Sequence, residues 1–217
     1  ISTFTAADSD LTNNAISPAA GYTNTLALTY TLTASDTNIW KYKVLDGSTT
    51  INTISTSKPS SGTIGNASGA HTLTVYVYDK AGNGKSKTYT MTYLPPENTA
   101  TISFSAADGD LTNNAITPAS GFTNSVAIVY SASATGTELW KYKILDGSTT
   151  IYDLSTTSPN GSSGSLANST SGTHTLKFYT YDKAGNAYSK SYSIIYWPPG
   201  TSGISGISAF SAVDGNL

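Results

Sequence analysis

Residues 71–83 read HTLTVYVYDKAGN, and this stretch decides the fold. Leu73, Val75 and Val77 occupy every second position, and threonine or tyrosine fills the positions between them. An apolar side chain at every second position is typical of a β-strand with one face in a core. In the DKAGN that follows, Gly and Asn tolerate positive φ, and the Asp side chain can accept hydrogen bonds from turn amides. The stretch therefore predicts a half-buried strand that ends in a tight turn.

The segments that precede this strand have the same period of two. Residues 26–32 alternate Leu or Tyr with Ala or Thr, and Trp40, Tyr42 and Val44 alternate with lysines. Turn sequences, including residues 59–62, separate the segments, and no window has an apolar stripe at helical spacing. About seven short strands in a unit of ~100 residues predict an all-β fold, an immunoglobulin-like β-sandwich in which Trp40 packs in the core.

The whole pattern is repeated along the chain. Residues 4–24 recur as residues 104–124 with 16 of 21 positions identical. The sequence YDKAGN is found at residues 78–83 and again at 181–186. A self-similar unit of this length predicts a serial array of one domain, and such arrays usually set reach and spacing rather than carry chemistry.

The repeats suggest domain boundaries. We expect one Ig-like repeat over residues 1–96 and a second over 97–199, each closed by a pair of prolines. Residues 200–217 are expected to form a linker and the first strand of a truncated third repeat, since FSAVDGNL at 210–217 resembles the opening of the second. Paired prolines favour a stiff, extended path, so successive domains are predicted to form a semi-rigid rod.

Short motifs in the first repeat carry a family resemblance. WKY at 40–42, DG at 46–47, HTLTV at 71–75 and DKAGN at 79–83 resemble the Ig-like repeats of bacterial and archaeal surface proteins. The resemblance covers both full repeats. It implies tandem Ig-like β-sandwich domains in a large secreted adhesin, stalk or filament protein, which is a structural role.

Composition excludes several classes of function. The chain has no cysteine, so disulfides and thiolate metal sites are excluded, and its net charge of -2 gives no basic surface for nucleic acid. No stretch approaches the ~20 apolar residues of a membrane span. With 11% charged residues, the polar surface is built from Ser, Thr and Asn, which suits an extracellular or cell-surface location.

Acidic residues near the start of each repeat are candidate calcium ligands. Asp8 and Asp10, repeated as Asp108 and Asp110, place hard oxygens at alternate positions, as calcium prefers. The alternative is a solvated turn in which Asp and Asn bond nearby amides, because no EF-hand loop and no bidentate Glu are present. Apart from calcium, no cofactor is expected.

The sequence gives little support for an enzyme. His71 and His174 occur once per repeat, too few for a zinc site, and are interpreted as residues near the start of a strand. No nucleophile motif and no pair of carboxylates on different elements is evident. We therefore expect no catalytic residues.

Two further kinds of site are predicted. Asn66, Asn160 and Asn168 lie in N-glycosylation sequons within Ser- and Gly-rich loops. The segment with Phe210, Ala212 and Asp214 reads as a lone strand, which is expected either to begin a further repeat or to build a polymer by strand addition to a neighbouring subunit.

The expected function is a structural repeat region, the semi-rigid stalk of an adhesin or the body of a surface filament. Its partners are then neighbouring repeats or subunits of the same protein. The alternative is a module that binds a surface glycan or a host protein through loops 52–70 and 153–173. The tyrosines opposite the core phase are another candidate contact surface, although outward tyrosines are also ordinary on a strand; they are Tyr76, Tyr78, Tyr179 and Tyr181.

Overall fold

The structure, a computed structural model, describes residues 1–96 and 99–200. Outside two single-turn 3-10 helices, η1 (Leu11–Asn13) and η2 (Leu111–Asn113), the regular elements in these ranges are strands. The strands of the first repeat are β1 (Thr3–Asp8), β2 (Tyr22–Thr23), β3 (Ala27–Thr33), β4 (Ile39–Asp46), β5 (Thr49–Ser55), β6 (Ser61–Thr63), β7 (Gly69–Asp79) and β8 (Gly84–Tyr93). Those of the second are β9 (Ala100–Asp108), β10 (Phe122–Thr123), β11 (Ala127–Gly136), β12 (Leu139–Asp146), β13 (Thr149–Ser155), β14 (Ser163–Ser165), β15 (Gly172–Asp182) and β16 (Ala187–Tyr196).

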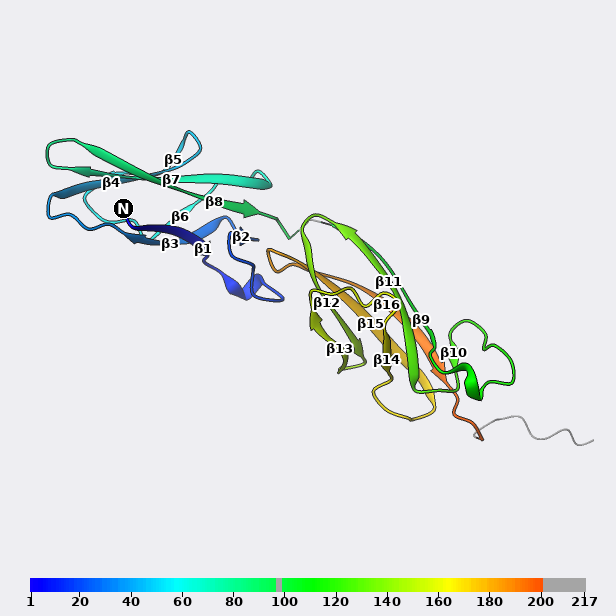
Figure 1. Cartoon of the computed structure of the whole chain (residues 1–217). Helices are drawn as coiled ribbons and strands as arrows, with labels where there is room; N and C mark the ends of the chain where they lie inside the picture. Colours follow the sequence, from blue (N-terminus) through cyan, green and yellow to red (C-terminus); the bar gives the residue numbers. More distant parts are fainter. Residues whose placement is uncertain (97–98, 201–217) are drawn as a thin grey trace, which may run out of the picture. The chain divides into compact units, whose positions relative to one another are not determined.

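Each repeat is a two-layer β-sandwich, as predicted. In the first, β1, β3 and β6 form one sheet and β2, β8, β7, β4 and β5 form the other, in that order (Figure 1). The second repeat has the same two sheets with every strand number raised by eight. Pairs such as β4 with β7 and β7 with β8 are antiparallel, but the short β2 pairs parallel with β8, and β10 pairs parallel with β16.

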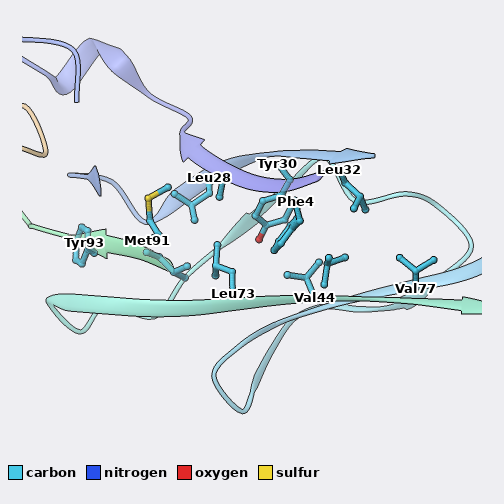
Figure 2. Close-up of a cluster of buried hydrophobic side chains, with 12 residues drawn as sticks. Phe4, Leu28, Tyr30, Leu32, Val44, Leu73, Val77, Met91 and Tyr93 are labelled. Carbon is cyan, nitrogen blue, oxygen red and sulfur yellow. The ribbon is translucent and has the colours of Figure 1, made fainter. Parts of the chain in front are cut away.

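The core of the first repeat lies between its two sheets. Figure 2 shows Phe4, Leu28 and Tyr30 on one side facing Leu73 and Val44 on the other. Leu28, Val44, Leu73 and Val75 are fully buried, which confirms that these positions of β3, β4 and β7 face the core as predicted. Fully burying a side chain of this size contributes about 1.5–3 kcal/mol, so these positions supply much of the stability of the repeat.

The second core keeps this pattern but has more aromatic residues. Ile128 and Ile144 stand at the positions of Leu28 and Val44, and both are fully buried. Phe178 replaces Val75, and its ring centroid lies 5.3 Å from that of Phe104. The added aromatic contact is worth about 0.5–1.5 kcal/mol beyond its buried area.

The position of Gly62 contradicts the turn predicted over residues 59–62. The prolyl segment 59–62 was expected to be a turn, but Gly62 lies within β6 and pairs with Leu28 of β3. The pairing with β3 brings Gly62 against the Tyr30 ring, and it requires glycine there, because a Cβ would overlap the Tyr30 hydroxyl and approach Ile51 Cγ2 to 2.6 Å. Burial raises the pKa of Tyr30 to about 12, in keeping with the closed space around its hydroxyl.

We expect Gly62→Ala to destabilise the first repeat by about 1–3 kcal/mol, because the added methyl forces the buried Tyr30 ring to move. Urea unfolding of the variant measures the loss. Gly47→Ala is the matched control, since Gly47 has φ +54° but open space around its Cβ position. Since Gly62 itself has no positive φ, a loss in Gly62→Ala no larger than that in Gly47→Ala would contradict the crowding by Tyr30.

The prediction that Trp40 packs in the core was wrong. Trp40 is 44% exposed, and the amine of Lys41 lies 4.0 Å from its ring centroid. The pairing of β4 with β7 shifts register between Ile39 and Lys41, and such a bulge re-aims the side chain between them. Ile39 packs against the core instead.

The chain packs as two compact units that do not coincide with the repeats. The first unit contains the described residues of 1–102 together with 134–142 and 179–189. The second contains 103–133, 143–178 and the described residues from Lys190 on. The turn between β15 and β16 therefore belongs to the same compact unit as the whole first repeat.

Candidate functional site

The turn of residues 182–186 is shaped by its first residue. One carboxylate oxygen of Asp182 accepts the amides of Ala184 and Asn186, each at 3.0 Å. The other accepts the Asn186 side-chain amide at 2.8 Å and the Tyr188 hydroxyl at 3.0 Å. Gly185 takes the left-handed φ of +88° that closes the turn. The prediction that Asp caps this turn is confirmed.

A second loop, residues 13–24, follows η1 in the first repeat. Its base is fixed by Asp8, which is 9% exposed and accepts the Thr23 hydroxyl at 3.0 Å and the Thr25 hydroxyl at 2.9 Å. Asp10 caps η1 by accepting the Thr12 amide at 3.1 Å. These bonds fix the two ends of the loop, and β2 near its end also pairs with β8.

Within the first compact unit, turn 182–186 is docked on loop 13–24. The Asn14 side chain donates to the Ala184 carbonyl at 2.8 Å. The backbone continues the contact, since the Ala15 amide donates to the Gly185 carbonyl at 2.9 Å and the Ala19 amide donates to the Lys183 carbonyl at 2.8 Å. Three carbonyls of the turn thus find donors on one loop.

Asn186 is the central polar side chain of this contact. Its oxygen accepts the Asn24 amide at 3.1 Å, and its own amide donates to the Leu94 carbonyl at 3.2 Å. Asn24 is 2% exposed and Asn186 is 7% exposed. A buried amide without partners is costly, so these bonds favour the docked arrangement strongly.

An ion pair lies at the edge of the contact. The Lys183 amine is 2.8 Å from the Glu138 carboxylate and 5.1 Å from the centroid of the Tyr22 ring. The hydrogen bond from Lys183 lowers the pKa of Glu138, and the same bond raises the pKa of Lys183. The pair is solvent-accessible, so it adds specificity more than stability.

A tyrosine beside the docked turn is buried as well. Tyr181 was predicted to lie on the outward phase, but it is 7% exposed, and burial raises its pKa. Its strand leads directly into turn 182–186. Tyr78, the equivalent residue of the first repeat, is only half-buried and leads into a turn that is exposed.

The two histidines form a separate pair of buried sites. His71 Nδ1 lies 2.6 Å from an Asp46 carboxylate oxygen, and its Nε2 lies 2.8 Å from the Ala67 carbonyl. His174 repeats this with Asp146 at 2.6 Å. Both ring nitrogens face acceptors, so both bonds form when each nitrogen carries a proton. The site is a structural link from β7 to the end of β4.

The calcium candidates lie at the base of the loops. Asp8 and Asp108 are buried, and their oxygens accept hydrogen bonds from amides and hydroxyls. Asp10 and Asp110 cap the 3-10 turns. Among the described residues, no group of three His, Cys, Asp or Glu is arranged to hold a metal ion. Calcium binding at these four residues stays a prediction.

The remaining candidates lie on loops or outside the described ranges. Asn66, Asn160 and Asn168 are exposed, as sequon residues must be, and glycosylation stays a prediction. The strand-addition residues Phe210 and Ala212, with Asp214, lie outside the described residues. In the described part of the chain, no helix has the length and apolar character needed to cross a bilayer.

The docked turn and loop were not predicted from the sequence. The turn has the same five residues in both repeats, so its own sequence carries no sign of docking. The available signal lies in Tyr22 and Glu138, because the other repeat has Phe122 and Asn38 at these positions.

Comparison with known proteins identifies relatives of the sandwich. The family model described as bacterial Ig-like domain matches residues 4–94 and 97–196. A search of curated proteins found no match. Among solved structures, the fibronectin(III)-like modules of Clostridium thermocellum CbhA align over 81% of this chain and 87% of theirs, with 17% identity and a TM-score of 0.51.

Two adhesin structures also align. A Ca2+-stabilized adhesin that helps an Antarctic bacterium bind ice is 19% identical over 89% of this chain and 48% of its own, with a TM-score of 0.36. A tetra-tandem repeat from the extending region of a large adhesion protein is 15% identical over the same shares, with a TM-score of 0.30. At these identities, the likeness concerns the fold.

Proposed function

Because the chain belongs to the bacterial Ig-like domain family, we propose that it is a spacer region of an extracellular cell-surface protein. It acts as the stalk of an adhesin or the body of a surface filament, and it performs no catalysis. Each repeat docks on the preceding one through a turn of the 182–186 type and a loop of the 13–24 type. Such docking limits bending between successive repeats, and a spacer that bends less keeps a more constant distance between its two ends.

The observation that carries the proposal is the burial of turn 182–186. Ala184 is fully buried, and the turn's three carbonyls are bonded to loop 13–24. An identical turn at 79–83 is exposed, so burial is not a requirement of the turn itself. A contact made in large part through backbone atoms suits a repeating structure, because those bonds do not depend on the side chains, such as Tyr22 and Glu138, that vary from copy to copy.

The proposal predicts that the two repeats tumble as one body. We expect Gly185→Ala to uncouple them, because a Cβ there would overlap the Ile16 carbonyl and approach Asn14 Nδ2 to 2.9 Å. ¹⁵N relaxation measures this, and the correlation time of second-repeat amides should fall toward that of a single domain. Gly82→Ala is the control, with φ +85° and open space around its Cβ position. Independent tumbling of the wild-type repeats, or equal effects of both variants, contradicts the proposal.

A binding module is the second candidate, and one observation favours it. Tyr42, Asn52 and Lys58 line a pocket of about 400 Å³ in the first repeat, within the loop region expected to recognise a glycan or a protein. Hydroxyls of several serines line the same pocket, as suits a polar ligand. A glycan array probed with wild type and Lys58→Ala tests this function, and signal that is lost in the variant supports it.

A further inference from the structure

The pocket of the first repeat lies between β5 and the segment that leads from β5 to β6. Its volume of about 400 Å³ is within the range of sites for small molecules. Tyr42 and Ile51 form its apolar base, since both are half-buried and pack against the core of the repeat. Asn52, Lys58 and several serines supply polar groups around this base. An apolar base with a few polar groups is typical of a ligand site.

Hydrogen bonds hold the sides of the pocket in place. The Asn52 side-chain amide donates to the Ser61 carbonyl at 3.1 Å, which joins β5 to β6. The Lys58 amine donates to the Leu32 carbonyl at 3.4 Å, and this bond ties the connecting segment to β3. Because the pocket is formed before a ligand arrives, binding does not have to order the chain around it.

The second repeat fills the corresponding space with a tyrosine. Tyr152 stands at the position of Asn52, and its hydroxyl donates to the Thr157 carbonyl at 2.8 Å. Thr157 stands at the position of Ser57, which lines the pocket of the first repeat. The Tyr152 side chain therefore spans the space that is open in the first repeat. Asparagine at this position leaves the pocket open, and tyrosine closes it.

The charge of the pocket indicates the kind of ligand. Of the residues that surround it, Lys58 is the charged one, and none carries a carboxylate. A lysine ammonium has three N–H donors, and the bond to the Leu32 carbonyl uses one of them. In the second repeat, Ser158 stands in place of Lys58, so the cation and the open space occur together in the first repeat. This combination favours an anionic group on the ligand.

The remaining groups favour a sugar ring as the body of that ligand. Serine hydroxyls both donate and accept hydrogen bonds, as the hydroxyls of a sugar do. The apolar base of Tyr42 and Ile51 can cover the C–H face of a ring, which an inorganic anion such as phosphate lacks. A sugar that carries a carboxylate matches the base, the hydroxyls and Lys58 at once.

We propose that this pocket binds a single sugar acid, a pyranose with one carboxylate, such as a uronic acid. The carboxylate lies at the Lys58 amine, and the ring lies over Tyr42. The proposal rests on the binding function given as the second candidate under Proposed function, and it is independent of the spacer role. It further implies that the residue at position 52 of each repeat decides whether that repeat binds sugar.

Titration of the ¹⁵N-labelled chain with sodium D-glucuronate tests the inference, at low ionic strength, where charges are least screened. D-glucose is the matched neutral probe, and sodium acetate is the anion without a ring. Glucuronate is expected to shift the amides of Asn52, Ser57 and Lys58 with a dissociation constant at least about tenfold below those of both other probes. Lys58→Gln should bring the affinity for glucuronate down to that for glucose.

Two tyrosine variants of β5 locate the binding. Asn52→Tyr should abolish the shifts, and it introduces the residue that the same position of the second repeat already holds. Ile54→Tyr is the matched control, because Ile54 is 54% exposed and lies outside the pocket. It should bind glucuronate as the wild type does. Binding that survives in Asn52→Tyr, or that both variants lose equally, overturns the inference.

The other probes separate the sugar acid from the wider binding function. Glucose or acetate that binds as tightly as glucuronate overturns the inference, as does an absence of shifts with glucuronate. If the glycan array still shows a signal that Lys58→Ala removes, the binding function stands and the sugar acid alone is wrong. If the array shows no such signal either, the binding function falls with the inference.

Discussion

His174→Ala is expected to lower the free energy of unfolding of the second repeat by about 3–5 kcal/mol, the largest loss among the polar positions. His174 is 7% exposed and bonds Asp146 through Nδ1 and the Thr170 carbonyl through Nε2. Without the ring, the Asp146 carboxylate stays buried and keeps the hydrogen bond from the Ala167 amide at 2.9 Å. Such a loss is comparable with the whole stability of a marginal domain.

Urea unfolding measures this loss, and hydrogen exchange assigns it to the second repeat. The Asp146→Asn/His174→Gln double-mutant cycle isolates the interaction of the two side chains. A coupling energy of about 1.5 kcal/mol or more is expected from a buried, charge-assisted bond. A loss below about 1 kcal/mol for His174→Ala would show that neighbouring groups fill the space left by the ring and that the His174–Asp146 pair contributes little to stability.

Asn186→Ala is expected to cost about 3 kcal/mol, against about 1 kcal/mol for Asn83→Ala. Both side chains bond the Asp that begins their turn, at 2.8 Å for Asn186 and 2.9 Å for Asn83. Asn186 in addition bonds Asn24 and the Leu94 carbonyl in a buried setting. The difference between the variants is therefore the contribution of docking, with the turn itself subtracted.

Equilibrium unfolding of both variants measures this difference. The Asn24→Ala variant supplies a second route to it, because it removes the same hydrogen bond from the other partner and leaves turn 182–186 intact. If Asn186→Ala and Asn83→Ala lose equal stability, the buried contact contributes nothing net and the difference in exposure between the two turns has no energetic consequence.

The sandwich could be predicted because its signal is local. Leu73 and Val75 reveal their inward phase by alternation alone, and the family match confirms the Ig-like fold. Trp40 was misplaced because a bulge depends on how β4 pairs with β7, and pairing is not visible in one strand. Gly62 was misplaced for a similar reason, since the Tyr30 ring that excludes a side chain comes from a distant strand.

The candidate site could not be predicted from the sequence, and the reason is different. Asp46 and His71 lie 25 residues apart, and their pairing follows from the sheet register that joins Asp46 to Leu73. Turns 79–83 and 182–186 have the same sequence but different surroundings, so no reading of the turn alone could separate them. The sequence does contain one pair of coordinated differences, Tyr22 with Glu138 against Phe122 with Asn38, and it becomes meaningful once the structure places Tyr22 beside Glu138.

The parallel pairing of β2 with β8 has a consequence for a repeat under tension. Tyr22 and Thr23 lie beside Thr92 and Tyr93, and the Thr92 and Leu94 amides donate to the Gly21 and Thr23 carbonyls at 2.7 and 2.9 Å. Tension applied to both ends of the repeat pulls β2 toward the N-terminal end of the repeat and β8 toward its C-terminal end. Parallel strands pulled this way slide past each other, so their hydrogen bonds bear the load together and are not peeled apart singly. The short β2 thus acts as a mechanical clamp, and rupture under force is abrupt.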